Sequence, residues 1–190
     1  MSNPPIRTRR WTRHEYERLI DLDVLHEDEP VELLAGRLAV SEPQTTPHAV
    51  AIQLVEDALR AAFGMGWSIR VQLPLALDPD SEPEPDVAVV RGVARDHLRR
   101  HPADPVLVVE VAHDSLRLDR TIKARLYARA GIADYWIVNL VDRVVEVHRE
   151  PIAEGRRRWR YGSLSVAQPG EILTPLAAVS GRISVDDLLP

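Results

Sequence analysis

The spacing of apolar residues predicts two helices and three strands in the first part of the chain. A capping-box sequence at residues 12–15 precedes apolar residues at helical spacing, so a first helix is expected there. Residues 31–40 hold two short apolar runs around Gly36, which predicts a β-hairpin. Residues 46–63 return to helical spacing and predict a second helix. Strict alternation over residues 67–77 then predicts a half-buried strand.

The second part of the chain contains continuous apolar runs, a pattern typical of strands covered on both faces. A third helix is expected over residues 115–130, because Gly131 follows at the usual C-cap position. Strands are predicted at residues 86–90, 106–109, 135–138, 144–148 and 156–164, and a short closing element at residues 183–189. This order of elements predicts an α/β fold: a mixed central β-sheet flanked by helices, with an N-terminal helix and β-hairpin.

The length of 190 residues fits one domain. We expect residues 12–190 to form it, and residues 1–11, which hold Pro and Arg without periodicity, to form a flexible arm. The absence of cysteine excludes disulfides, thiol catalysis and zinc–thiolate sites. No apolar run approaches the length of a membrane span and no signal peptide is evident, so we expect a cytoplasmic protein with no membrane partner.

The formal net charge of −5 argues against strong non-specific nucleic-acid binding by the domain as a whole. It does not exclude a local basic face, for which the arginine runs at residues 99–101 and 156–160 are candidates. A solvated hairpin edge explains such runs equally well.

Lys123 is the only lysine among the 24 Lys and Arg residues of the chain. Arginine is planar and always charged, whereas lysine is a compact ammonium with an adjustable pKa, so the two are not interchangeable at a chemical site. A leftover surface lysine explains this composition as well as a chemical role does.

Two acids stand where apolar residues are expected. Asp86 opens an apolar strand directly after Pro85, and Glu110 interrupts the most apolar strand of the chain. A buried carboxylate needs a cation or strong donors. One candidate cation is a divalent metal held jointly by Asp86 and Glu110, and another is Lys123, which the next helix would bring back beside Glu110. Alternatively, Glu110 pairs with an arginine and Asp86 caps a turn.

Two carboxylates on adjacent strands bind hard cations such as Mg²⁺, which prefer oxygen ligands. A bound metal lowers the pKa of its water and stabilises charge on a phosphoryl oxygen, and a nearby lysine orients that water or offsets the developing charge. The predicted chemistry is phosphodiester hydrolysis, although spacing alone leaves the structural alternative open.

Four segments, residues 84–90, 108–111, 119–123 and 126–139, together resemble the Uma-two family of endonucleases. That family belongs to the PD-(D/E)XK nuclease superfamily, and the resemblance covers about residues 12–189. It implies the restriction-endonuclease-like fold.

The resemblance also implies roles for individual residues. Asp86 and Glu110 would be the metal-binding acids. The usual lysine position, two residues after the second acid, holds Ala112, so Lys123 would be a relocated lysine supplied from the helix. Glu32 would add a carboxylate from the hairpin.

His48 would contact metal, water or phosphate, and Gln72 is a weaker candidate for the same site. Asp119 is expected to orient Lys123 from one helical turn away. Tyr127 is expected to pack with its hydroxyl at the rim of the site, and Trp136 to lie in the core.

Asp134 and Asn139 depart from the residues common in the family. We interpret both as loop positions outside the proposed catalytic core.

The leading hypothesis is a Mg²⁺-dependent DNA endonuclease, in which Mn²⁺ can substitute for Mg²⁺. Cutting two strands with one site per chain favours a symmetric homodimer. The alternatives are a catalytically silent nuclease-fold binding module in a defence or mobile-element system, and a metal-dependent hydrolase of RNA or a small phosphoester.

Overall fold

A six-stranded mixed sheet forms the centre of the protein. The computed structural model describes residues 8–26, 29–41, 44–155 and 158–190. The strand order is β3-β4-β5-β6-β7-β8, and β5 and β6 are its parallel pair. The strands are β3 (Trp67–Val71), β4 (Val87–Arg91), β5 (Leu107–Ala112), β6 (Asp134–Asn139), β7 (Val144–Ala153) and β8 (Trp159–Ala167).

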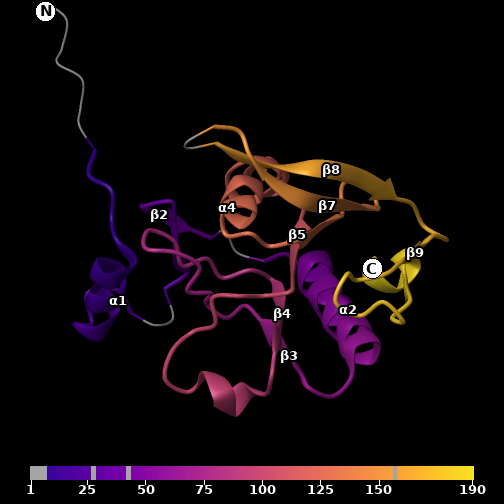
Figure 1. Cartoon of the computed structure of the whole chain (residues 1–190), viewed down its shortest axis with the longest axis horizontal. Coiled ribbons are helices and arrows are strands. Elements are labelled where there is room, and N and C mark those ends of the chain that lie inside the picture. Colours follow the sequence, from indigo (N-terminus) through magenta and orange to yellow (C-terminus); the bar gives the residue numbers. More distant parts are fainter. Residues whose placement is uncertain (1–7, 27–28, 42–43, 156–157) are drawn as a thin grey trace, which may run out of the picture.

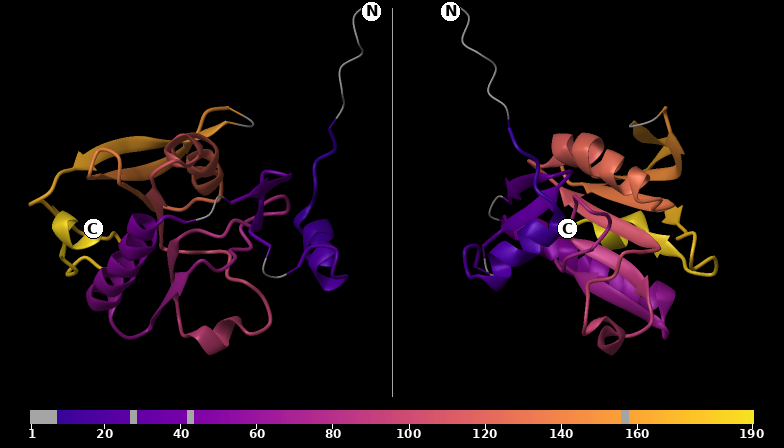
Figure 2. Two further views of the ribbon diagram at one scale, coloured as in Figure 1. Left: turned by 180° about the vertical axis from the view of Figure 1, so that it is seen from behind. Right: turned by 60° about the vertical axis from the view of Figure 1, so that its left-hand side comes forward.

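Parallel neighbours need a crossover connection, and here it is helical. The crossover consists of α3 (Leu116–Leu118), the π-helical turn η2 (Asp119–Lys123) and α4 (Ala124–Arg129). It packs against one face of the sheet, while α2 (Thr46–Phe63) covers the other face (Figures 1 and 2).

Alternation along β5 assigns each side chain to one of these faces. Val109 and Val111 belong to the core beneath α2, whereas Val108 and Ala112 belong to the core beneath α4. Glu110 lies two residues from both Val108 and Ala112, so its side chain shares their face and points toward the crossover helix. The sheet geometry thus directs the one acid of this buried strand toward the helix that carries Lys123.

The remaining elements surround this core. They are α1 (Arg13–Asp21), β1 (Val31–Leu34), β2 (Arg37–Val40), η1 (Ala94–His97), β9 (Ile172–Leu173), β10 (Ile183–Ser184) and η3 (Val185–Leu188). The last of these, η3, lies near the C-terminus and contacts α2 (Figure 1). No helix of the described residues is both long enough and apolar enough to traverse a bilayer.

Arg129, the last residue of α4, binds the proline-rich loop of residues 72–86 between β3 and β4. Its guanidinium donates to Asp78 at 2.6 Å, to Asp80 at 2.6 Å and to Ser81 at 2.9 Å. The same loop is tied to the β1–β2 hairpin, since the Leu33 amide donates to the Glu82 carbonyl. Arg129 therefore connects α4 to the loop that leads to Asp86, and backbone hydrogen bonds connect that loop to the hairpin.

Two predicted elements differ in detail. The strand predicted over residues 67–77 ends at Val71, because Gln72 has a left-handed φ of 49° and Pro74 follows. The helix predicted over residues 115–130 is not uniform but contains the π-helical turn. Alternation and capping signals do not reveal either departure.

The interpretation of Asp134 and Asn139 as loop positions is wrong. Both lie in β6 and are completely buried. Asp134 accepts hydrogen bonds from Trp136 and Arg149, and Asn139 donates to Glu146. Both are structural members of the sheet. Trp136 lies in the core, as predicted.

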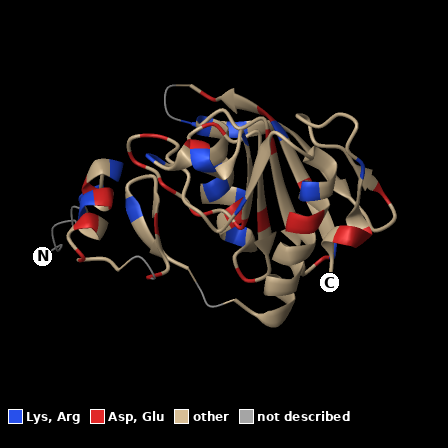
Figure 3. Cartoon of the chain, turned by 90° about the horizontal axis from the view of Figure 1, so that it is seen from below, with Lys and Arg blue, Asp and Glu red and all other residues tan. Residues whose placement is uncertain are grey.

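The arginine run at residues 99–101 does not lie at the ends of β4 and β5 that carry the acids. Residues 99–101 follow the C-terminal end of β4, whereas Asp86 precedes its N-terminal end. Residues 156–157 of the second run lie outside the described residues. Cationic and acidic residues are interspersed along the chain (Figure 3).

We predict that Arg129→Ala lowers the free energy of unfolding by about 1–3 kcal/mol, because it leaves two partly buried carboxylates without their shared donor. Urea denaturation measures the change. Arg125→Ala is the matched control, since Arg125 is exposed on the same helix. An equal effect of the two substitutions would show that Arg129 has no special structural role.

Candidate active site

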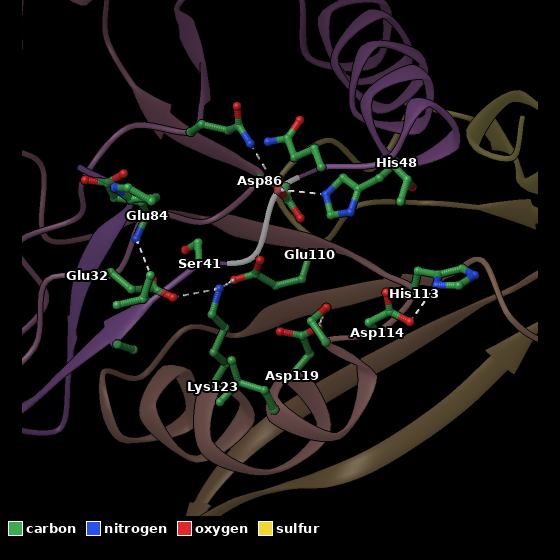
Figure 4. Close-up of a pocket in the computed structure, with 18 of the residues that line it drawn as sticks. Glu32, Ser41, His48, Glu84, Asp86, Glu110, His113, Asp114, Asp119 and Lys123 are labelled. Carbon is green, nitrogen blue, oxygen red and sulfur yellow. Dashed lines mark hydrogen bonds and ion pairs between the residues drawn. The ribbon is translucent and has the colours of Figure 1, made fainter. Parts of the chain in front are cut away.

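A cleft of about 820 Å³ opens where the β1–β2 hairpin, the start of α2 and the crossover helix meet the end of β5 (Figure 4). Its lining is strongly acidic. Lys123 is the only Lys or Arg among the described lining residues, and His48 and His113 are the histidines among them. The acids are Glu29, Glu32, Glu84, Asp86, Glu110, Asp114 and Asp119.

Glu110 and Lys123 form a buried ion pair at the bottom of this cleft. The Lys123 ammonium donates to Oε1 of Glu110 at 3.0 Å and lies 3.5 Å from Oε1 of Glu32. Glu110 is 2% exposed and Lys123 is 7% exposed. The inference that the crossover returns Lys123 to Glu110 is confirmed as geometry, and the isolated lysine of the sequence is not a surface residue.

The electrostatics of the pair reflect a surplus of negative charge. Burial raises the pKa of Glu110 to about 8, because the nearby acids add to the effect of burial and Lys123 only partly opposes it. Burial alone would lower the pKa of Lys123, but Glu110, Glu32 and Asp119 outweigh it and hold that pKa well above its ordinary value. Lys123 is therefore a permanent cation surrounded by carboxyl groups.

Asp86 lies beside this pair through the register of the sheet. Val87 pairs with Val109 in an antiparallel ladder, so continuing the register by one residue places Asp86 opposite Glu110. The Val111 amide donates to Oδ2 of Asp86 at 2.8 Å. Strand β5 thus carries Glu110 and also fixes the second acid.

Two further predicted residues contact the other oxygen of Asp86. His48, in the first turn of α2, places Nε2 3.3 Å from Oδ1, and Gln72 donates to the same oxygen at 3.5 Å (Figure 4). The backbone bend that ends β3 at Val71 directs Gln72 toward Asp86. The structure therefore brings all five predicted site residues, and Gln72, into one cleft.

Asp119 and Lys123 lie at the two ends of the π-helical turn, and both are buried. The Ala124 amide donates to the Asp119 carbonyl, five residues earlier. Such single π-turns occur frequently at functional sites. The predicted contact between Asp119 and Lys123 is not among the hydrogen bonds or ion pairs of the described residues. Instead, Asp119 accepts the Ser115 hydroxyl at 2.6 Å.

Tyr127 packs in the core as predicted, but the prediction that its hydroxyl lies at the rim is wrong. Its hydroxyl is not at the rim but is completely buried, and it donates to Oε1 of Glu110 at 2.6 Å. A helical spacing of four residues from Lys123 places both side chains on the same face, which was the available signal.

Glu84 is a site residue that the sequence reasoning missed. It lines the cleft, and its amide donates to Oε2 of Glu32 at 3.1 Å. Burial and the neighbouring Glu32 raise the pKa of its carboxyl group. Its position two residues before Asp86 was the signal, since such residues share one side of an extended chain.

The donor set fits a hard divalent cation. Asp86 and Glu110 offer carboxylate oxygens, and Mg²⁺ is commonly held by one or two carboxylates together with several waters. Within the described part of the chain, no group of three or more His, Asp or Glu side chains is arranged to hold a metal ion. Water or substrate would therefore complete the coordination.

Comparisons with known proteins identify the family and the fold. The chain matches the Uma2 (Uma-two) family, described as "Putative restriction endonuclease", over residues 13–186. It is also similar to a crystal structure described as "a putative nuclease belonging to DUF820" from Anabaena variabilis ATCC 29413. The two are 16% identical with a TM-score of 0.68, over 90% of this chain and 96% of that one. No curated protein matches.

The structural likeness confirms the restriction-endonuclease-like fold, and the family match spans nearly the whole chain. The chain therefore belongs to the Uma2 family of restriction-endonuclease-like nucleases.

Proposed function

We propose that the protein is a Mg²⁺-dependent endonuclease that hydrolyses DNA phosphodiester bonds, with Mn²⁺ as a substitute ion. The observation that carries this proposal is the buried pair of Glu110 and Lys123 beside Asp86 in an open cleft. Two acids and a lysine supply a metal site together with a cation that can act on the attacking water.

The charge of the cleft supports a requirement for metal. A phosphodiester is an anion, and the acids that line the cleft outnumber the single ammonium. Like charges repel strongly in a partly desolvated site, so phosphate binds there only when additional positive charge is present. A divalent cation at Asp86 and Glu110 supplies that charge where the two acids meet.

The chain's own residues then have separate tasks. The metal, when bound, lowers the pKa of its water and stabilises charge on the phosphoryl group. Lys123 orients the attacking water or offsets the negative charge of the phosphorane. Glu32, on the other side of the ammonium, keeps Lys123 in the cleft. His48 and the Val111 amide fix the orientation of Asp86.

DNA is favoured over RNA by the family's description as a restriction endonuclease. The net charge of −5 favours site-restricted binding over tight general binding. One set of Asp86, Glu110 and Lys123 per chain favours a symmetric homodimer for cutting both strands of a duplex.

We predict that Glu110→Gln reduces metal-dependent plasmid nicking by about 100-fold or more, because an amide is a weak ligand for a hard cation. The metal-free protein should be at least as stable as wild type, since the substitution removes one of several crowded acids. Nicking assays with Mg²⁺ and Mn²⁺ and urea denaturation in a chelator measure the two effects. Full nicking by a folded Glu110→Gln variant would refute the assignment.

We predict that Lys123→Arg reduces nicking by about 10-fold or more while metal binding persists. The substitution keeps the positive charge but replaces a compact ammonium by a broad planar fork. Arg125→Lys is the matched control, because it makes the reverse exchange at an exposed position two residues away. Unchanged nicking by Lys123→Arg would mean that the cleft needs only a charge there, with no particular need for lysine. Parallel incubation with RNA tests the choice of DNA.

A further inference from the structure

Tyr127 and Lys123 donate to the same oxygen of Glu110. The phenol hydroxyl lies 2.6 Å from Oε1, and the ammonium lies 3.0 Å from that atom. The described residues place no hydrogen-bond donor on Oε2. Because Glu110 lines the cleft, Oε2 is the oxygen that remains for a ligand entering from the cleft.

The phenol is held firmly in this position. Tyr127 is completely buried, and its ring packs at 4.9 Å, centroid to centroid, from the ring of Tyr135. The Tyr135 hydroxyl donates at 3.2 Å to the carbonyl of Asp119 in the π-helical turn. Burial, followed by the nearby Glu110, raises the pKa of Tyr127 well above its ordinary value, so its hydroxyl keeps its proton and remains a donor.

A second buried tyrosine provides a comparison, because its hydroxyl donates only to the backbone. Tyr161 is also buried, and its hydroxyl donates at 2.9 Å to the backbone carbonyl of Ile132. Tyr127 differs because it donates to a carboxyl group of the cleft, and hydrogen bonds to such charged acceptors are shorter and stronger.

Two donors on one oxygen also have a consequence for Lys123. If Lys123 were the only donor, any movement of the ammonium toward water or phosphate would release the carboxylate. With Tyr127 in place, Oε1 of Glu110 keeps a hydrogen-bond donor while Lys123 moves. The ammonium itself keeps a nearby carboxyl group, because Glu32 lies 3.5 Å from it.

We propose that Tyr127 is a positioning residue of the metal site: it holds Oε1 of Glu110 and so presents Oε2 to a divalent cation. This inference rests on the proposed function, because it requires Glu110 to bind metal. Groups that orient metal ligands in this way commonly contribute about 10–100-fold to metal affinity.

The test is Mn²⁺ binding to Tyr127→Phe, measured by calorimetry on the full chain. The substitution removes one hydroxyl and keeps the ring. We expect the dissociation constant to rise about 10-fold. Tyr161→Phe is the matched control: it loses a buried hydroxyl bond of similar kind but should leave the dissociation constant within about twofold. Urea denaturation verifies that both variants fold.

Nicking as a function of Mn²⁺ concentration gives a second readout. If Tyr127 acts by presenting Glu110, Tyr127→Phe should need about 10-fold more Mn²⁺ for half-maximal rate and recover most of the rate at saturation. A general structural defect would lower the rate at every concentration, and that result would overturn the inference.

The inference is also overturned if folded Tyr127→Phe binds Mn²⁺ as wild type does, or if both tyrosine variants weaken binding equally. These results differ from a failure of the proposed function itself. If wild-type protein binds no Mn²⁺ and nicks no DNA, the metal site is refuted together with every role assigned within it.

Discussion

The cleft depends on one buried ammonium held among several carboxyl groups. Lys123 contacts Glu110 and lies near Glu32, while Asp86 and Asp119 add negative charge around it. A buried charge is tolerated only when paired and hydrogen-bonded, so these groups have to be brought together accurately. The acids exceed the cations, and burial together with the neighbouring acids raises the pKa of Glu110. The metal proposal follows from this imbalance, since a divalent cation is the natural complement of surplus carboxylates.

The fold serves this arrangement at several levels. Alternation along β5 points Glu110 at the crossover helix, and the antiparallel register brings Asp86 opposite it. The π-helical turn carries Lys123, and Tyr127 in the next turn donates to the Glu110 carboxyl group. Arg129, further along the helix, ties down the loop that leads to Asp86. The short crossover therefore carries Lys123, Tyr127 and Arg129: the cation, the phenol and the arginine that binds the loop.

Glu110 and Lys123 could be predicted as site residues because each departs from the sequence pattern around it. An acid inside an apolar strand requires a partner, and the only lysine of the chain stands on the following helix, so Glu110 and Lys123 could be linked from sequence. The spacing of four residues placed Tyr127 on the same helical face as Lys123, but it did not identify Glu110 as the acceptor of the hydroxyl, because a buried helical tyrosine resembles an ordinary packing residue. Asp134 and Asn139 were misplaced for a similar reason, since polar residues at strand ends resemble loop residues until their buried partners are seen. The end of β3 at Val71 depends on a left-handed Gln72, which alternation does not encode.

The most direct test of the central claim is binding of Mn²⁺ to the acids of the cleft. A carboxyl group must be ionised to bind a cation, and burial among other acids raises the pKa of Glu110, so binding should weaken as the pH falls. Calorimetric titration with Mn²⁺ at several pH values measures the dissociation constant. We predict that wild type binds Mn²⁺ less tightly at lower pH, and that Glu110→Gln binds it much more weakly than wild type at every pH. Wild-type protein that binds no Mn²⁺, or a folded Glu110→Gln variant that binds it as tightly as wild type, would contradict the account.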